Sequence, residues 1–346
     1  MALRIEDAIA RTGLASFMLP AALEAREPAE VRGAGRDDVR LLVTSGPDGD
    51  AVHARFTDLQ AFLRPGDLIV LNASATVPSA LWATTPAGDR FRLHVSTRQH
   101  GGACVVEARE HGPLPGETAT LDGGAVLTFV GPYRDSRRLW VARIDGAGDL
   151  IEYLYRFGEP IAYKHVTREW PIEAYQTVYA EEAGSAEMTS AGRPFTQEML
   201  RRLRENGVDV ATIVLHTGVS SPERDESPYE EFFRVPSVTV ERVEHARERG
   251  GRVIAVGTTV VRALESAIDG RGALQASSGW TDLIIGPRRG VRVADGMITG
   301  FHEPRSTHIA MLEGLAGRRH VANAYASALE GRYLWHEFGD SHLLLP

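Results

Sequence analysis

Cysteine and long apolar runs are scarce in this sequence of 346 residues. Its one cysteine, Cys104, excludes an intramolecular disulfide and leaves no thiolate cluster for zinc or an iron–sulfur centre. We expect Cys104 to be a small buried hydrophobic residue rather than a nucleophile. No stretch approaches the ~20 apolar residues of a membrane span, and residues 1–20 mix acidic with apolar side chains, unlike an export signal. These absences predict a cytoplasmic protein with no membrane partner.

Several common nucleotide-binding and catalytic motifs are also missing. No G-x-G-x-x-G follows an early strand and no P-loop is present, so neither a dinucleotide nor a nucleoside triphosphate is indicated. The nucleophile motif G-x-S-x-G is absent too. His302 and Glu303 do not form the H-E-x-x-H spacing that places two histidines on one helical face, and His308 and His320 have no ligand spacing. The sequence therefore predicts no metal site.

The formal net charge of −8 argues against broad affinity for nucleic acid, because neutralising phosphates requires clustered Lys and Arg. A local basic face is still compatible with that charge. Two short arginine clusters are more typical of solvated faces than of phosphate tracks: Arg134, Arg137 and Arg138, and Arg201, Arg202 and Arg204. With 43% hydrophobic and 24% charged residues, the chain has ordinary globular composition and enough length for two domains.

Residues 40–151 are rich in short alternating apolar runs broken by Gly, Pro and Asp. Period-two runs at this spacing predict a small antiparallel sheet or barrel. The runs are at 67–71, 91–95, 105–108, 126–130 and 139–144. The Gly/Asp-rich bend at 145–149 is the best boundary, so we predict a β-barrel-like domain at 61–149 inserted in an α/β main domain formed by 1–60 and 150–346.

The second half alternates helices with strands. Thr196 can cap a helix that stops at Gly207, and Gly257 to Thr259 can open another. Strands are predicted at 208–216, 252–256 and 282–285, and further helices at 237–249, 306–315 and 320–331. Such alternation predicts a mostly parallel sheet covered by helices.

One strand-to-helix turn, within residues 252–267, is the most informative local pattern. Gly257 ends a buried strand and lets a ligand approach the backbone, while Thr258 and Thr259 lie where free N–H groups of the next helix point outward. This favours a carboxylate or hydroxyl ligand. An ordinary capped turn is the alternative.

Three other segments contain candidate ligand-binding groups. A tyrosine of residues 175–179 could stack on a purine beneath a closing loop at 183–192, or the two tyrosines could simply pack at a domain seam. His216 follows a buried strand, at the sheet edge where α/β folds bind ligands. The loop at 301–307 and the turn at 338–340 could bind ribose hydroxyls.

In their order along the chain these segments resemble the S-adenosylmethionine:tRNA ribosyltransferase-isomerases of queuosine synthesis. The similarity runs from FMLPAALEA to FGDSHLLL and is closest at PGDLIVLN, YQTVYA, RVIAVGTTVVRALESA, GWTDLIIGP and NAY. The resemblance implies an α/β main domain with an inserted β-barrel. It also implies S-adenosylmethionine as ribosyl donor, a 7-deazaguanine amine of tRNA as acceptor, release of adenine and methionine, and no metal or redox cofactor.

The sequence departs from the family pattern at several motifs. T-A-G-L-H-F corresponds to residues 190–195, where Pro194 replaces a histidine. L-H-V-G-x-G-T-F corresponds to 215–222, which keeps His216 but loses the second glycine and the aromatic residue. H-x-M-H-x-E aligns with 226–231, where Tyr229 replaces a histidine and Glu231 is kept. The family motif N-F-H-L-P appears here as G-F-H-E-P at 300–304, and Y-G-D-A-M appears as F-G-D-S-H at 338–342. Because unpaired partners left in a core are costly, these joint changes indicate a rebuilt site.

From this resemblance we expect four residues to transfer protons or position ribose: His216, Glu231, His302 and Asp340. Expected substrate-binding residues are Tyr175, Gln176, Gly192, Phe195, Gly257, Thr258, Thr259, Arg262, Phe301, Ser306 and Thr307. The expected partners are S-adenosylmethionine and tRNA. Two alternatives stay open: a paralogue that uses S-adenosylmethionine with a small-molecule acceptor or none, and a non-catalytic S-adenosylmethionine-binding protein.

Overall fold

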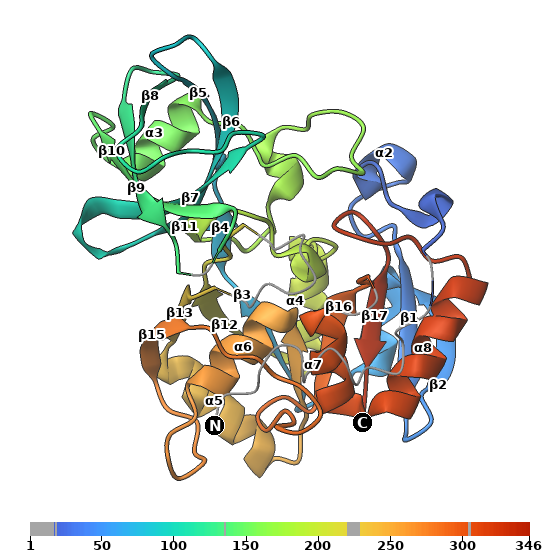
Figure 1. Cartoon of the computed structure of the whole chain (residues 1–346). Helices are drawn as coiled ribbons and strands as arrows, with labels where there is room; N and C mark the ends of the chain where they lie inside the picture. Colours follow the sequence, from blue (N-terminus) through green and yellow to red (C-terminus); the bar gives the residue numbers. More distant parts are fainter. Residues whose placement is uncertain (1–16, 18, 135, 220–228, 304–305) are drawn as a thin grey trace.

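The computed structural model describes residues 17, 19–134, 136–219, 229–303 and 306–346. Figure 1 shows an α/β body with a β-barrel at one corner, which confirms the predicted fold class. The positions 220–222 and 226, where family motifs were compared, lie outside the described residues. No helix in the described part of the chain is both long and apolar enough to cross a membrane.

The secondary-structure elements have the following bounds. The strands are β1 (Arg40–Ser45), β2 (Asp50–Arg55), β3 (Leu68–Asn72), β4 (Ser74–Thr76), β5 (Ala80–Thr84), β6 (Arg90–Arg98), β7 (Ala103–Arg109), β8 (Thr118–Leu121), β9 (Val126–Pro132), β10 (Leu139–Asp145), β11 (Glu182–Ser185), β12 (Asp209–Leu215), β13 (Glu231–Val235), β14 (Val253–Val256), β15 (Ser277–Thr281), β16 (Gly296–Gly300) and β17 (Ser341–Leu344). The α-helices are α2 (Ala29–Arg32), α3 (Leu150–Phe157), α4 (Gln197–Glu205), α5 (Ser237–Glu248), α6 (Thr258–Ser266), α7 (Thr307–Ala316) and α8 (Arg318–Glu330), and 3-10 helices lie at Ala21–Leu23, Phe56–Phe62, His100–Gly102, Ile172–Tyr175 and Ser190–Gly192.

The main sheet has nine strands in the order β15-β13-β12-β3-β14-β16-β17-β1-β2. Its centre, β12-β3-β14-β16, is parallel throughout, whereas the outer pairings are antiparallel except for β17 with β1. The sheet is therefore mixed, with the predicted parallel arrangement at its centre.

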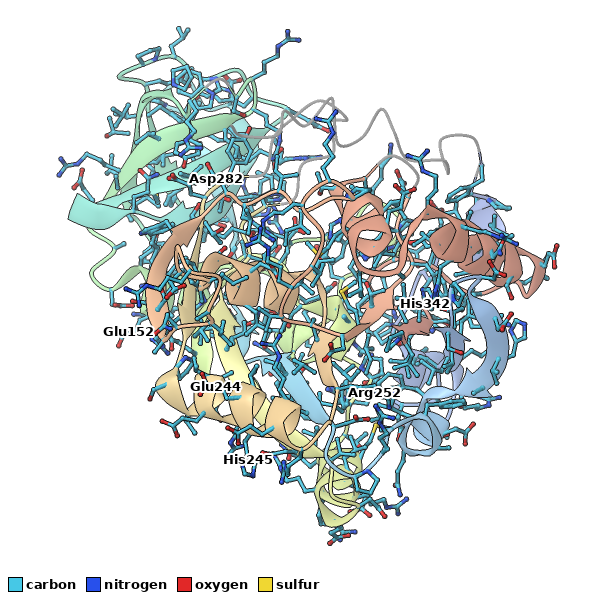
Figure 2. All side chains as sticks on the ribbon, turned by 90° about the horizontal axis from the view of Figure 1, so that it is seen from below. Glu152, Glu244, His245, Arg252, Asp282 and His342 are labelled. Atoms are coloured by element: carbon cyan, nitrogen blue, oxygen red, sulfur yellow. The ribbon has the colours of Figure 1, made fainter. Side chains whose placement is uncertain are left out.

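Period-two alternation along β3 divides the core into two layers. Leu68 and Val70 pack with α5, α6, α7 and α8, whereas Ile69 and Leu71 pack with α4 and the 3-10 helix Phe56–Phe62. On α5, Val243 is buried against the sheet, while Glu244 and His245 are exposed (Figure 2). Helices therefore cover both faces, as a sheet with a parallel centre requires.

The barrel is closed in the order β10-β7-β6-β5-β8-β9. Helix α3, whose N-cap Asp149 accepts hydrogen bonds from Ile151 N and Glu152 N, closes the barrel core with Tyr153 and Leu154. The chain enters through β4 and returns through β11, and these two strands pair with each other. The barrel is thus an insertion anchored by one short two-stranded sheet.

Two strand predictions are wrong. The strand expected at 67–71 was grouped with the barrel, but as β3 it lies at the centre of the main sheet, since a short fully apolar run suits either setting. The strand expected at 282–285 is β15 instead, at Ser277–Thr281.

Several local predictions are confirmed. Thr196 caps α4 by accepting from Met199 N. Cys104 is 1% exposed, and burial raises the pKa of its thiol to about 12, so it is the predicted buried hydrophobic residue. The arginine clusters differ from one another: Arg201 is exposed and pairs with Glu198, whereas Arg138 is nearly buried and lies 3.3 Å from a Glu107 oxygen.

Candidate active site at the carboxyl edge of the sheet

The four central parallel strands all end at one edge of the sheet. Asn72 is the last residue of β3, His216 follows β12, Gly257 follows β14, and His302 comes two residues after β16. Open α/β sheets bind ligands at this edge, because the loops that leave the strands diverge there. Two of the four predicted catalytic residues, His216 and His302, are therefore placed along it.

Asn72 links three of these chain segments and was not predicted as a site residue. Its side-chain Nδ2 donates to Leu215 O at 2.8 Å and to Thr259 Oγ1 at 3.3 Å, and its Oδ1 accepts from Leu215 N at 2.9 Å and Ser74 N at 3.1 Å. It is 1% exposed. The signal in the sequence was a polar residue ending an apolar strand. The Asn72 amide thus donates two hydrogen bonds and accepts two, and these bonds fix the start of α6 against β12.

His216 is enclosed by polar and aromatic neighbours. Nδ1 lies 2.8 Å from Ser74 Oγ and Nε2 lies 3.5 Å from Glu182 Oε1. Its ring stacks near Phe232, with centroids 5.6 Å apart, and a Cβ on Gly184 would lie 2.6 Å from the ring. Burial lowers the pKa of His216, and the carboxylate of Glu182 acts in the opposite direction. The imidazole is therefore held neutral at neutral pH.

A line of hydroxyl groups sets the hydrogen-bonding pattern of this imidazole. Thr217 N donates to Ser185 Oγ at 3.0 Å, and Ser185 Oγ lies 2.6 Å from Ser74 Oγ. Every hydroxyl proton has an acceptor when Ser185 donates to Ser74 and Ser74 donates to His216 Nδ1. This arrangement leaves the proton of His216 on Nε2, facing Glu182.

Glu231 and Arg262 form a nearly buried ion pair between β13 and α6. The second Glu231 oxygen accepts from Gly218 N at 2.9 Å. Arg262 also donates to Thr281 O at 3.1 Å and Leu283 O at 3.3 Å. Both residues were predicted for the site, and the structure joins them beside the loop that follows His216.

The N-terminus of α6 opens onto the same edge. Its N-cap, Gly257, has φ 88° and ψ 156°, and no described side chain caps the helix. Thr258 and Thr259 are half-buried, and Thr259 Oγ1 accepts from Asn72. The first N–H groups of a helix attract anions. The carboxylate or hydroxyl ligand expected at this turn from the sequence stays a prediction.

His302 is stacked on His308, with ring centroids 4.0 Å apart and planes 16° from parallel. Burial, with the nearby His308 and His336, lowers the pKa of His302 well below its usual value. Burial lowers the pKa of His308 to about 4, with Arg262 acting in the same direction and Glu337 opposing it. Arg262 and Glu337 therefore act on the His308 member of this neutral pair.

The predicted tyrosine segment packs at a seam. Tyr175 is 3% exposed and its ring contacts Phe338, with centroids 5.5 Å apart. The Gln176 amide is fully engaged with the backbone of Thr76, accepting at 3.0 Å and donating at 2.6 Å. These contacts agree with the alternative reading of the tyrosines and fasten the return from the barrel.

Other predicted binding residues also have packing roles. Only glycine fits at position 192, because the Cβ of any other residue there would lie 1.6 Å from the Tyr179 hydroxyl. Phe195 and Phe301 have no exposed surface; the first packs edge-on against Phe56 and the second among the aromatic rings of the main core. Both rings are therefore part of the hydrophobic core.

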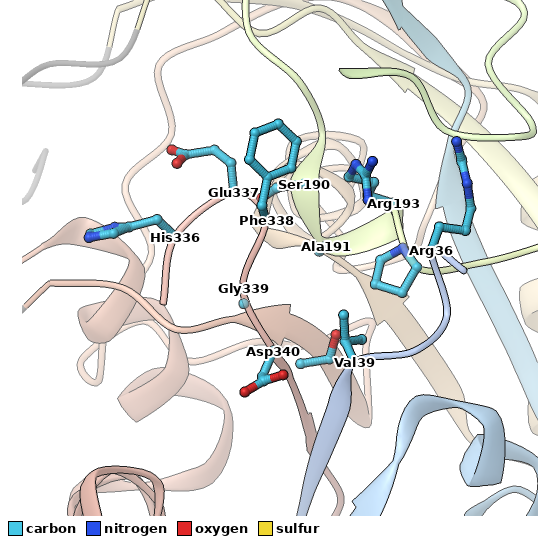
Figure 3. Close-up of a pocket in the computed structure, with 13 residues that line it drawn as sticks. Arg36, Val39, Ser190, Ala191, Arg193, His336, Glu337, Phe338, Gly339 and Asp340 are labelled. Atoms are coloured by element: carbon cyan, nitrogen blue, oxygen red, sulfur yellow. The ribbon is translucent and has the colours of Figure 1, made fainter. Parts of the chain in front are cut away.

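Ser306 and Thr307 begin α7, where the Ser306 hydroxyl accepts from Ile309 N at 3.3 Å. Asp340 is 5% exposed and accepts from Arg40 N at 2.9 Å and Leu334 N at 2.7 Å. Its carboxylate also pairs with the Arg40 guanidinium at 3.0 Å. Asp340 therefore organises its own turn, at the bottom of the pocket drawn in Figure 3.

An α/β body with neutral histidines, a buried ion pair and an open helix N-terminus at one sheet edge, and with a barrel inserted beside it, defines an α/β enzyme without a phosphate-binding loop. A family model described as queuosine biosynthesis protein matches residues 14–344. The chain belongs to this family, that of the S-adenosylmethionine:tRNA ribosyltransferase-isomerases.

Relatives of that name align along their full length. Those of Moorella thermoacetica and Halothermothrix orenii are 35% and 34% identical, and the alignments cover 95% of this chain and 98% of each relative. The crystal structure of S-adenosylmethionine tRNA ribosyltransferase from Thermotoga maritima is 28% identical and superposes with a TM-score of 0.54, covering 96% of this chain and 100% of that one.

Proposed function

We propose that this chain transfers and isomerises the ribosyl group of S-adenosylmethionine onto the amine of a 7-deazaguanine in tRNA, in queuosine synthesis in the cytoplasm. The observation that carries the proposal is the meeting of His216, the Glu231–Arg262 ion pair and the open N-terminus of α6 at the carboxyl edge of the sheet. The full-length relationship to enzymes named for this reaction supports it.

S-adenosylmethionine offers three features that this edge can recognise. Its carboxylate suits the free N–H groups at Thr258 and Thr259. Its sulfonium acidifies the adjacent C5′ protons, so a neutral histidine can take part in proton transfer. Burial keeps the pKa of both His216 and His302 below the usual value, and these are our proposed proton-transfer residues. The proposed reaction itself needs no metal or redox cofactor at this edge.

The acceptor end has changed more than the donor end. Pro194 lines the pocket of Figure 3, and the Tyr229 ring packs beside Tyr133 of the barrel, with centroids 5.5 Å apart. Both replace histidines of the family pattern. The turn at Gly257 to Thr259 keeps the family sequence. We therefore place the donor at α6 and the acceptor toward the barrel.

Two measurements test the proposal. Calorimetric titration with S-adenosylmethionine should give saturable heat at one site per chain, and adenosine should bind more weakly because it lacks the carboxylate and sulfonium. Incubation with S-adenosylmethionine should release adenine only when tRNA carrying the 7-deazaguanine amine is added; tRNA with unmodified guanine is the control. Adenine release with small amines alone would reassign the acceptor, and binding without any release would indicate a non-catalytic protein.

A further inference from the structure

Two histidines and a glutamate from distant parts of the chain meet beside the loop between α8 and β17. One nitrogen each of His165 and His336 and one carboxylate oxygen of Glu337 lie within 4.8 Å of one another, the only such group among the described residues. The imidazole rings are stacked, with centroids 4.4 Å apart and planes 26° from parallel. Figure 3 shows the side chains of His336 and Glu337 on the same side of their loop, pointing away from Arg36 and Arg193.

The polar atoms of this cluster are buried and lack hydrogen bonds to described residues. These atoms are His165 Nε2, His336 Nε2 and Glu337 Oε2. His165 Nε2 lies 3.0 Å from Glu337 Oε2, but the contact lacks hydrogen-bond geometry. Glu24 Oε1 lies 3.7 Å from His336 Nε2, beyond hydrogen-bonding distance. Because unpaired buried polar atoms cost free energy, an ordinary His–Glu pair does not account for the arrangement.

The backbone around His336 is fixed by contacts of its own. His336 has a φ of 71°, an unusual value for a residue other than glycine. The turn is closed by Gly339 N donating to His336 O at 3.0 Å, and it is tied to the N-terminal segment by Trp335 N donating to Leu23 O at 2.8 Å. Strained backbone conformations of this kind are concentrated at functional sites.

We propose that His165, His336 and Glu337 bind one divalent transition-metal ion, with Zn²⁺ as the best-matched ion. Two imidazole nitrogens and a carboxylate oxygen form a ligand set that zinc favours, and three protein ligands leave a fourth position for water or a substrate atom. Bonds of about 2.1 Å in a tetrahedral site place ligand atoms about 3.4 Å apart. Metal binding therefore requires the two stacked rings to rotate so that the ligand atoms, now within 4.8 Å of one another, move closer together, and a bound metal would then satisfy all three atoms.

The metal position adjoins the candidate active site. His336 and Glu337 line the same pocket as Gly300, at the end of β16, and Asp340 (Figure 3). A metal there would join the segment around His165 to the loop before β17, beside this pocket. This revises the expectation of no metal, which was based on sequence spacing and on the family resemblance: the two histidines are far apart in the sequence and meet only in the fold.

Metal titration of the full-length protein tests this inference independently of the ribosyl-transfer activity. After treatment with EDTA and dialysis, titration with Zn²⁺ against a chromophoric chelator should give one ion per chain. Replacing Zn²⁺ by Co²⁺ should give the intense visible absorption of a four-coordinate site. His336→Gln and His165→Gln should each weaken Zn²⁺ binding by at least about a hundredfold, since even outer-shell changes commonly cost about 10- to 100-fold.

His111→Gln provides the matched control. His111 Nε2 lies 2.7 Å from Glu117 Oε1 in the barrel, an ordinary hydrogen-bonded His–Glu pair outside the cluster. This variant should bind Zn²⁺ as the wild type does. Circular dichroism and urea unfolding in EDTA establish which variants are folded, and Glu337→Gln replaces any that are not. Unchanged binding in folded cluster variants, or no stoichiometric binding by the wild type, would overturn the inference.

Discussion

The hydroxyl group of Ser74 lies 2.8 Å from His216 Nδ1, and this contact couples the point where the chain enters the barrel to the carboxyl edge of the main sheet. Ser74 begins β4, the strand that leads into the barrel, and His216 follows β12. The same hydroxyl contacts Ser185 on β11, where the chain returns. Movement of the barrel relative to the body would therefore be transmitted to the histidine.

Ser74→Ala should lower both stability and adenine release. The substitution leaves His216 Nδ1 unpaired in a buried site, which costs about 1–3 kcal/mol in the free energy of unfolding. Ser185→Ala is the comparison variant, because it leaves the contact between Ser74 and His216 while it removes the contact with Ser74 and the acceptor of Thr217 N. Urea unfolding and adenine release measured on both variants compare them. Wild-type adenine release by a folded Ser74→Ala variant would mean that the Ser74 hydroxyl does not act through His216.

The helices of the main domain were largely predictable because they depend on local patterns, whereas only β12 and β14 of its nine strands were placed correctly. Thr196, Asp149 and Ser306 each cap the helix that follows, and a serine, threonine or aspartate before an apolar period can be recognised in the sequence. The position of β3 was not predictable, because five consecutive buried residues suit a barrel or a parallel sheet equally.

The candidate site was predicted less completely than the fold. His216 was identified from its position after a strand and from a family motif, and His302, Glu231 and Arg262 from segments that resemble the family. Asn72 and His165 were missed, because their roles depend on partners distant in the sequence. Phe301 looked like a ligand-binding aromatic but is fully buried in the main core, and sequence pattern cannot distinguish these two settings.

Gly257→Ala should destabilise the protein and weaken donor binding, and Gly317→Ala provides a closely matched control. Both glycines precede a helix with nearly the same backbone angles, φ 88° and 86° with ψ 156°. An alanine at either position adopts a conformation that costs about 1–3 kcal/mol. A Cβ at Gly257 also contacts Ala191 at 3.4 Å, whereas one at Gly317 meets no atom within 4 Å.

Only Gly257 lies at the proposed carboxylate site, so only Gly257→Ala should also reduce affinity for S-adenosylmethionine. Urea unfolding should show similar losses for both variants, and calorimetry should separate them. If the two alanine variants bind the donor equally well, the donor does not lie against α6.

Acid should destabilise the protein below about pH 6.5, because the pKa of a histidine in the unfolded chain is about 6.5. Burial lowers the pKa of His308 to about 4 and that of His342 to about 3. Below the unfolded-state value the unfolded chain binds a proton that the folded chain does not. Each such histidine therefore removes about 1.4 kcal/mol of unfolding free energy per pH unit until its folded pKa is reached.

Urea unfolding at several pH values between 7 and 5 measures this slope. In wild type, His342 Nε2 lies 2.8 Å from the Thr44 hydroxyl, and His342→Gln keeps an amide near that hydroxyl. This variant should reduce the slope by the contribution of one histidine, about 1.4 kcal/mol per pH unit. His245→Gln replaces an exposed histidine on α5 and should leave the slope unchanged. A wild-type slope in His342→Gln would show that His342 is not the group that resists protonation.

Binding of tRNA should depend on salt, but less steeply than for a strongly basic protein. The formal net charge is −8, and arginines of both clusters singled out in the sequence already have acidic partners, as in Arg134 with Glu230 and Arg201 with Glu198 and Glu205. These ion pairs leave fewer cations of the two clusters free to displace counterions from phosphates. With about four phosphate contacts, affinity should fall about a hundredfold between about 50 and 200 mM salt, compared with about 10³- to 10⁵-fold for six to ten contacts.

A gel-shift series across that range of salt concentrations, with S-adenosylmethionine binding measured in parallel, tests this prediction. No tRNA complex at the lowest salt, together with intact donor binding, would exclude tRNA as the acceptor and favour a small-molecule amine.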